Sequence, residues 1–530
     1  MTWTTSRLAL AAALFLSFTA NWRFLSVAAD AFPPSDGNLL FLVSLPLLHV
    51  CVLVFLLLAV SSRLTFKPVL SFLLIVAASS AYFSDRFGTV VDQTMILNMF
   101  ETDVREVLDL LTPEWMVRMA VLGLLPVLLL WRVTVTRAPW RSELRSRLIL
   151  AAGALATAVA LVLLFGSSYA SFFREFKPIR YYATPSYPVY SLFKFAGAGR
   201  GGAAVGPPAR IAEDAHYEDV VHSHGELMVL VIGETARADH FSLYGYGRET
   251  NPVLSSTPGI YSFQSVSSCG TSTAVSVPCI FSDIDQSDFD VGESSARENL
   301  LDVLQRVGVS VLWRDNNSDS KGVALRVQYE DFKSPKRNPV CDEECRDVGM
   351  LDGLQEYVDA HPGDVLIVLH QMGNHGPAYF KRYPPEFEHF TPACKSIKLS
   401  ECEDAEIVNA YDNAIRYTDW FLGQVIEFLK QNEDQYETMM LYVSDHGESL
   451  GEYGMYLHGA PYAFAPESQT HVPLIIWQGM NNDVDELSLQ QREAMPASHD
   501  AIYSSVLEFF EIMTADMEPE KELFELDAQR

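Results

Sequence analysis

The stretch LMVLVIGETARADH, residues 227–240, begins with six consecutive apolar residues and then becomes polar. A short, uniformly apolar run is typical of a β-strand that is buried on both faces of a sheet. Four similar runs follow, separated by polar segments long enough for helices: Val309–Trp313, Val365–Leu369, Met439–Val443 and Val472–Trp477. This alternation predicts an α/β domain with a largely parallel sheet. Pro473 restricts the last run to a strand start or a sheet edge.

Polar residues follow the first four of these predicted strands. They are Glu234, Asn317, Lys321, His375, Asp445, His446 and His458. Ligands of open α/β sheets bind beyond the carboxyl ends of the strands, and zinc accepts imidazole and carboxylate ligands. The set therefore predicts a zinc site at this edge of the sheet. Each residue alone also fits a structural role: Glu234 could favour a helix start, Asp445 could cap a helix, and His375 could lie in a surface turn.

A candidate nucleophile lies in SCGTSTAVSVPC, residues 268–279. Direct coordination to zinc can turn a Ser or Thr hydroxyl into an alkoxide, which is a strong nucleophile. If the segment starts a helix, the free N–H groups of its first turn would also favour a phosphate there. The residue types leave Thr271, Ser272 and Thr273 as candidates, and the alternative is that all three only cap a helix.

Six of the seven cysteines form close pairs in the second half of the chain: Cys269 with Cys279, Cys341 with Cys345, and Cys394 with Cys402. An even number of closely spaced cysteines indicates disulfides formed in an oxidising compartment. Zinc binding by thiolates is the competing interpretation, but the spacings give no CxxC pairs. We therefore expect three short-loop disulfides. The seventh, Cys51, lies in an apolar segment.

Five apolar stretches in the first third predict membrane spans: about Leu8–Ala29, Leu39–Val60, Pro68–Phe83, Val117–Trp131 and Leu148–Phe173. Arginines and lysines concentrate before the first span and in the second and fourth loops, while the other loops are mainly acidic. By the positive-inside rule the N-terminus is cytoplasmic and the chain after about residue 174 lies outside. The alternative for the first stretch is a signal peptide cleaved near SVAADA.

The chain then divides into three parts: a transmembrane domain at 1–174, a bridging segment and linker at 175–225, and an outer domain at 226–530. The linker contains AGAGRGGAAVGPPAR, residues 196–210, which cannot build a core. Residues 1–200 carry 17 Lys and Arg against 11 Asp and Glu, whereas residues 201–530 carry 21 against 56. So acidic an outer part argues against a nucleic-acid partner. We interpret the acidic charge as favouring solubility or adaptation to saline surroundings, rather than as a binding site.

The motifs GETARADHFSLYGYGRETNP, SCGTSTAVSVPC, DNNSDSKG, HQMGNHGPAY and SDHGESLGEYGMYLHG occur in this order between residues 233 and 459. Together they resemble the lipid A phosphoethanolamine transferases of the alkaline phosphatase and sulfatase superfamily, and the likeness covers nearly the whole chain. It implies a five-span α-helical membrane domain followed by an alkaline-phosphatase-like domain in the bacterial periplasm.

The resemblance also implies roles for single residues. Thr273 corresponds to the nucleophile, and Glu234, Thr273, Asp445 and His446 to the tightly bound zinc site. The implied reaction has two steps: Thr273 takes phosphoethanolamine from phosphatidylethanolamine and releases diacylglycerol, and a lipid A phosphate then takes the group. The remaining matched positions bind the transferred group or, for the two histidines, a second zinc: His375, His458, Asn317 and Lys321.

Two further expectations concern the surroundings of this site. Asn98, Thr102 and Glu106 recur every four residues, so they share one face of a helix, and they match a family pattern for lipid substrate binding. The alternative is an ordinary interfacial amphipathic helix. A Cys269–Cys279 disulfide would hold the turn of the nucleophile against the zinc site.

One difference separates the chain from many members of the family. Ser320 and Ala324 stand where these relatives have the two cysteines of a disulfide. The mobile colistin-resistance branch is similar to this chain in lacking that disulfide. Without it, the position of Lys321 is less constrained.

Two other functions remain open. One is a transferase with another acceptor, such as a core sugar, or another donor head group, such as phosphoglycerol; the other is a metal-binding sensor without catalysis. The complete ligand set and Thr273 disfavour the sensor. Lipid A modification would imply polymyxin resistance.

Overall fold

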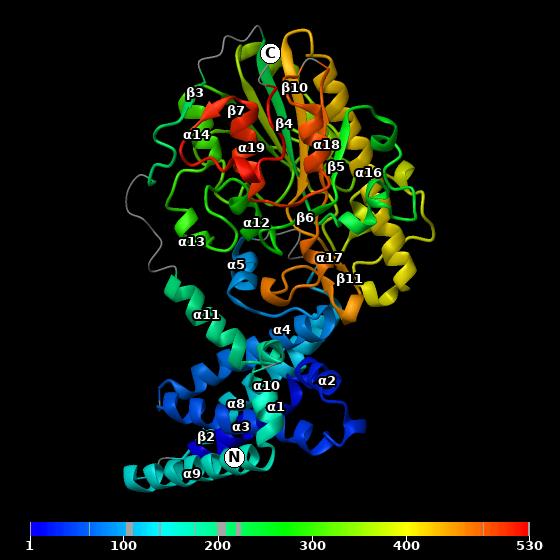
Figure 1. The fold of residues 1–530 in the computed structure, drawn as a ribbon. Helices are drawn as coiled ribbons and strands as arrows, with labels where there is room; N and C mark the ends of the chain where they lie inside the picture. The colour runs from blue at the N-terminus through cyan, green and yellow to red at the C-terminus, as the bar shows by residue number, and fades with distance from the viewer. Residues whose placement is uncertain are drawn as a thin grey trace. The chain divides into compact units, whose positions relative to one another are not determined.

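The computed structural model describes residues 2–62, 64–101, 110–136, 139–174, 176–198, 208–218, 224–480 and 482–527. The chain forms two compact units (Figure 1). The helical unit contains Met1–Ile96 and Leu111–Gly197, and the larger α/β unit contains Leu97–Leu110 and Ala198–Arg530.

Among the described residues of the helical unit, four helical stretches are long and apolar enough to cross a membrane. They are α3 (Leu39–Val60), α4 (Phe66–Phe87), the continuous stretch Pro113–Arg132 and α9 (Trp140–Leu164). The stretch Pro113–Arg132 consists of α7 (Pro113–Arg118), a π-helical turn (Met119–Leu124) and α8 (Leu125–Arg132). The unit also contains β1 (Thr2–Trp3), β2 (Thr134–Val135), α10 (Gly166–Arg174) and nearly all of α11 (Ser186–Ala198). Helix α5 (Gln93–Glu101) begins in this unit and belongs to the α/β unit from Leu97 on.

The first predicted span is two helices, α1 (Thr5–Thr19) and α2 (Trp22–Ala31), bent by 59°. Counted as one span, the pair brings the total to five. The break falls at Asn21, whose side-chain amide donates to the carbonyls of Leu16 and Thr184 and accepts from the Thr184 N–H. The Asn21 side chain thus hydrogen-bonds one carbonyl near the end of α1 and both backbone groups of Thr184 at the break between the two helices. The last predicted span also divides, because α9 ends at Leu164 and α10 begins at Gly166.

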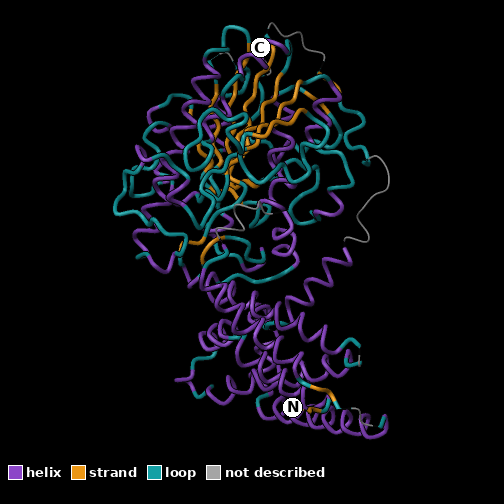
Figure 2. Tube along the Cα trace, turned by 180° about the vertical axis from the view of Figure 1, so that it is seen from behind, coloured by secondary structure: helices purple, strands orange, loops and turns teal. Residues whose placement is uncertain are grey.

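A seven-stranded sheet forms the centre of the α/β unit (Figure 2). Five strands are parallel and adjacent, in the order β10 (Tyr436–Ser444), β4 (Gly225–Gly233), β9 (Val365–His370), β7 (Ser310–Asp315) and β8 (Gln328–Asp331). Next to β10 lie β13 (Leu474–Gln478), which is antiparallel, and β5 (Ile260–Phe263). Strand β13 begins directly after Pro473, as the sequence predicted. The predicted α/β class is correct.

The continuous apolar run of β4 is explained by burial on both faces of the sheet. Met228, Leu230 and Ile232 belong to the core that packs against α14 (Leu300–Val307) and α19 (Ala501–Phe509). The alternate residues Leu227, Val229 and Val231 belong to the opposite core, with α15 (Leu354–Ala360) and α16 (Asp404–Lys430). Every residue from Leu227 to Ile232 is fully buried, which explains why all six are apolar.

Short elements complete the unit. The helices are α12 (Thr273–Ile280), α13 (Val291–Ser294), α17 (Glu467–Thr470) and α18 (Glu486–Arg492). The strand pairs are β6 (Ser265–Ser267) with β14 (Pro496–Ser498), β11 (Ser449–Leu450) with β12 (Tyr456–Leu457), and β3 (His216–Tyr217) with β15 (Ile512–Met513).

The amino end of β4 carries a buried carboxyl group, Glu226, that should make stability depend on pH. Burial, reinforced by nearby carboxylates, raises the pKa of Glu226 from 4.5 to about 10. The folded state therefore keeps a proton that the unfolded chain releases above pH 4.5, so the free energy of unfolding falls as pH rises from 4.5 toward 10. The contributing carboxylates are Asp364, Glu511, Glu437 and Asp483.

Glu226→Gln should remove this penalty, because glutamine is neutral and of nearly the same shape. At pH 7 the variant should be more stable than the wild type by up to about 3 kcal/mol, with a larger difference at pH 9 and almost none at pH 4. Urea unfolding of the purified chain across this pH range measures the effect. Glu356→Gln, in the first turn of α15, is the control. Equal pH dependence of wild type and Glu226→Gln would refute the expectation.

Candidate metal centre and nucleophile

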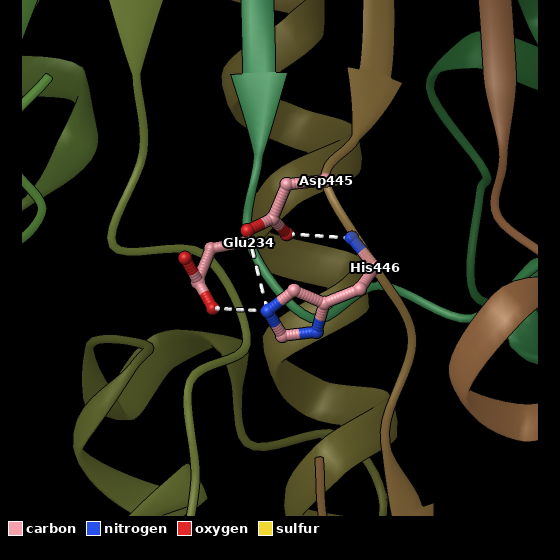
Figure 3. Close-up of side chains that lie close together, drawn as sticks. All are labelled: Glu234, Asp445 and His446. Carbon is pink, nitrogen blue, oxygen red and sulfur yellow. Dashed lines mark hydrogen bonds and ion pairs between the residues drawn. The ribbon is translucent and has the colours of Figure 1, made fainter. Parts of the chain in front are cut away.

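Two neighbouring parallel strands bring three fully buried side chains together at their carboxyl ends (Figure 3). Glu234 follows β4, and Asp445 and His446 follow β10. His446 Nε2 lies 3.5 Å from Glu234 Oε1 and 3.3 Å from Asp445 Oδ2. The strand register pairs Ser444 with Gly233, so the residues that follow each strand must meet.

The atoms of this group that face one another are suited to a metal ion. Asp445 Oδ1 accepts the backbone N–H groups of Thr235 (3.2 Å) and His446 (2.8 Å). Asp445 Oδ2 and Glu234 Oε1 are buried without a hydrogen-bond partner in the structure. His446 Nδ1 donates to the Gly447 carbonyl at 2.9 Å, so Nε2 carries the lone pair. One ligand atom from each residue lies within 4.8 Å of the others, as a divalent cation requires.

The electrostatics of the group also favour a cation. Burial, and then the nearby Glu234 carboxylate, raise the pKa of Asp445 well above its ordinary value. Burial lowers the pKa of His446 well below its ordinary value. Two carboxylates and a neutral imidazole are thus held together away from water, which is unfavourable unless a positive charge lies between them. The residues therefore fit a divalent metal.

Of the three candidate hydroxyls, the one on Thr273 contacts this group. Thr273 is the first residue of α12, and its Oγ1 donates to Glu234 Oε2 at 3.1 Å and lies 3.4 Å from His446 Nε2. Thr271 Oγ1 instead donates to the Ala460 carbonyl at 2.6 Å. Ser272 Oγ is buried without a partner in the structure. Because Thr273 is the first residue of α12, its hydroxyl belongs to the helical turn whose first N–H groups have no partner within the helix.

All three predicted disulfides are present: Cys269–Cys279, Cys341–Cys345 and Cys394–Cys402. The first joins the turn before Thr273 to the last part of α12, so it encloses the candidate nucleophile. Cys51 is buried in α3 and is not bonded.

The other predicted site residues of the α/β unit differ in how directly they contact Glu234, Asp445 and His446. Asn317 donates from Nδ2 to Glu234 Oε2 and to the Gln371 carbonyl, both at 2.7 Å. The His458 ring lies 5.4 Å from the His375 ring and 4.4 Å from the His446 ring, centre to centre. Lys321 Nζ donates to the Ser318 carbonyl at 3.2 Å, within the loop that carries Asn317.

The predicted lipid-binding face falls largely outside the described residues. Asn98 lies in α5, and its side chain is partly buried. Thr102 and Glu106 lie outside the part of the chain that the structure describes.

Comparison with known proteins matches both units to families. Residues 226–512 match the sulfatase family model, and residues 49–198 match the model of phosphoethanolamine transferases EptA/EptB. The chain is 45% identical to phosphatidylethanolamine transferase Mcr-2 of Escherichia coli, over 94% of each chain. It is 37% identical to phosphoethanolamine transferase EptA of Escherichia coli K12, over 94% of this chain and 92% of that one. The chain belongs to the phosphoethanolamine transferase family.

The transferase also shares its fold with a solved structure along nearly the whole chain. The integral membrane protein lipooligosaccharide phosphoethanolamine transferase A of Neisseria meningitidis matches with a TM-score of 0.94 at 33% identity, covering 99% of this chain and 98% of that one. The family and this match agree with the α-helical membrane part and the α/β part predicted from the sequence.

One residue close to the site was not singled out from the sequence of the transferase. Glu448 is fully buried; its Oε2 accepts from His458 Nδ1 at 2.9 Å, and its Oε1 accepts from the Tyr379 hydroxyl at 2.6 Å. Burial would lower the pKa of His458, but the Glu448 carboxylate outweighs it and the pKa is raised. Its position three residues after Asp445, in DHGE, is the one signal that the sequence offers.

Proposed function

We propose that this transferase moves phosphoethanolamine from phosphatidylethanolamine to a phosphate of lipid A, through a covalent intermediate on Thr273, and that it depends on zinc. The observation that carries the proposal is the contact of the Thr273 hydroxyl with Glu234, inside the buried group completed by Asp445 and His446. The relatives named above support the chemical classes, since they are phosphatidylethanolamine and lipooligosaccharide phosphoethanolamine transferases.

Zinc is the proposed metal because the donor set combines two carboxylates, one imidazole and one hydroxyl. Glu234, Asp445, His446 and Thr273 would hold it. When bound, zinc would lower the pKa of the Thr273 hydroxyl and offset the negative charge of the phosphate.

In the first step, Thr273 Oγ1 attacks phosphorus of the donor. The Thr273 hydroxyl loses its proton as Oγ1 forms the new bond to phosphorus. The bond from phosphorus to the diacylglycerol oxygen breaks, and that oxygen gains one proton and leaves as a hydroxyl, so the step has no net change in protons. Thr273 begins α12, and the N–H groups of a helix's first turn favour the negative charge of a phosphate. Asn317 donates a 2.7 Å hydrogen bond to Glu234 Oε2 and so orients this carboxylate. The same oxygen accepts the hydrogen bond from the Thr273 hydroxyl.

In the second step, a phosphate oxygen of lipid A attacks the same phosphorus. The bond to Thr273 Oγ1 breaks, and Thr273 regains a proton. We propose that His375, His458 and Lys321 bind the transferred group or, for the histidines, a second zinc. His458 is the better supported of the three, because Glu448 favours its charged form, which would attract a phosphate.

We propose that the protein is a multi-pass protein of the bacterial inner membrane. In this arrangement residues 1–174 form the membrane domain, 175–225 bridge, and 226–530 form the catalytic domain in the periplasm. The apolar helices and the three disulfides support this placement, because disulfides persist in oxidising compartments. We also propose that Asn98, Thr102 and Glu106 contact the lipid substrate.

Labelled lipids test donor and acceptor together. Membranes from producing cells are supplied with phosphatidylethanolamine carrying an isotope in its head group, and lipid A, core sugars and diacylglycerol are analysed by mass spectrometry. We expect the label in lipid A, diacylglycerol in equal amount, and lower polymyxin susceptibility of the cells, because the modification reduces the negative charge that attracts the cationic peptide. Label in core sugars, or transfer from phosphatidylglycerol instead, would overturn the assigned acceptor or donor.

A further inference from the structure

His499 is a buried histidine that has no part in the reaction described above. It follows strand β14, which pairs in parallel with β6, and its N–H donates to the Ser267 carbonyl at 3.1 Å. Only 1% of its surface is exposed. The chain after Ser267 leads through Cys269 to Thr273, so His499 lies beside the start of the turn that carries the nucleophile.

The ring of His499 makes two hydrogen bonds, one from each nitrogen. Nδ1 accepts the backbone N–H of Cys269 at 3.1 Å, and Nε2 donates to the Ser444 carbonyl at 2.9 Å. A carbonyl oxygen can only accept and an N–H can only donate, so these partners define the neutral ring with its proton on Nε2. Burial lowers the pKa of His499 to about 4, which keeps this form at physiological pH.

These two bonds connect the two halves of the candidate centre. Ser444 is the last residue of β10 and directly precedes Asp445 and His446. Cys269 is bonded to Cys279 of α12, the helix that begins with Thr273. The turn has other supports. The Gly459 N–H donates to the Thr271 carbonyl at 2.8 Å and the Gly270 N–H donates to Ser276 Oγ of α12 at 3.0 Å, but neither bond involves a residue of β10.

We propose that His499 is a positioning residue. Its ring fixes the distance between the turn that carries Thr273 and the end of β10, which is followed by two proposed metal ligands, Asp445 and His446. The inference rests on the proposed function, since it assigns a role toward the same nucleophile and metal. Its physical basis is that the attacking oxygen must lie within coordination distance of the metal. A shift of about 1 Å in a reacting group can cost about 100-fold in rate.

Two substitutions break the bridge at opposite ends. His499→Asn keeps an acceptor near the position of Nδ1 but loses the bond to Ser444, and His499→Gln keeps a donor near the position of Nε2 but loses the bond to Cys269. For the purified full chain with zinc, we expect each variant to lower kcat for diacylglycerol release about 10- to 100-fold, with KM for phosphatidylethanolamine within about twofold. Bound zinc should be unchanged.

The control separates positioning from loss of stability. Ile502→Val removes one buried methyl group from α19, close to His499 in the chain, without touching either ring bond. It should lower Tm slightly and leave kcat unchanged. The inference would be overturned if both His499 variants kept kcat within about twofold of the wild type. It would also be overturned if kcat fell by no larger a factor than the amount of bound zinc.

A second readout does not depend on the lipid substrate. Cobalt replaces zinc, and its visible absorption reports the ligands around the ion. Thr273→Val, which lacks the hydroxyl, sets the spectrum expected without that ligand, and both His499 variants should shift toward it. Wild-type spectra in both variants would overturn the role of His499. A wild-type chain that binds cobalt but releases no diacylglycerol would refute the proposed function alone, and the spectra would still decide the role of His499.

Discussion

Cells that produce the Thr273→Ala variant are expected to leave their lipid A unmodified. Thr273 Oγ1 is the hydroxyl that contacts Glu234 and lies beside His446, and alanine offers no atom to form the covalent intermediate. Removal of a nucleophile commonly costs at least about 10³-fold in rate. Mass spectrometry of lipid A should therefore show the phosphoethanolamine adduct with the wild type and none with the variant.

Ser272→Ala is the matched control for this experiment. Ser272 precedes Thr273 and is also buried, but its hydroxyl has no hydrogen-bond partner in the structure. Its loss should leave the lipid A adduct in place. An adduct that appears with both wild type and Thr273→Ala, or with neither, would rule out Thr273 as the nucleophile of lipid A modification.

Asp445→Asn is expected to remove the metal while leaving the fold intact. Two backbone N–H groups fix one oxygen of this carboxylate, so the amide oxygen of asparagine must take that place. The amide NH₂ then points at the metal position, where it offers hydrogens in place of a lone pair. We expect metal affinity to fall at least about 100-fold, with diacylglycerol release falling in parallel.

Elemental analysis of the purified variant measures bound zinc. Thermal unfolding with and without added zinc measures how much zinc binding stabilises the folded chain. Zinc should raise the Tm of the wild type and hardly change that of Asp445→Asn. Asp419→Asn is the control for zinc content, because Asp419 is also a fully buried carboxylate. Its Oδ2 accepts from the Val253 N–H and its Oδ1 from the Leu254 N–H, so the amide must give up one bond, and this variant should lose stability without losing zinc. Equal zinc content in wild type and Asp445→Asn would exclude Asp445 as a ligand.

The sequence predicted the central strands and the residues that follow them, because burial on both faces leaves a continuous apolar run. It did not predict β8, since QYED is short and carries polar residues that a sheet edge tolerates. Nor did it predict that β13 runs antiparallel, because an apolar run carries no direction. The break at Asn21 was missed because it depends on Thr184, far away in the chain.

The candidate site was predictable to the extent that strand ends converge. Glu234, Asp445 and His446 follow adjacent parallel strands, so their meeting follows from the strand pattern. Thr273 lies on a separate helix, and the residues alone left it equal to Thr271 and Ser272. His499 was not predictable at all, because its role depends on two backbone groups, those of Cys269 and Ser444, whose neighbours are set by tertiary packing.

The sheet order has a consequence for how the protein is made. Strand β4 is central, but both of its partners, β9 and β10, come much later in the chain. Thr235 and Asp445, which share a hydrogen bond at the centre, are 210 residues apart. During synthesis from the N-terminus, Glu234 is therefore made long before β10 and the two residues that complete its group, Asp445 and His446. The three side chains can meet only after most of the chain has been made and the sheet has closed.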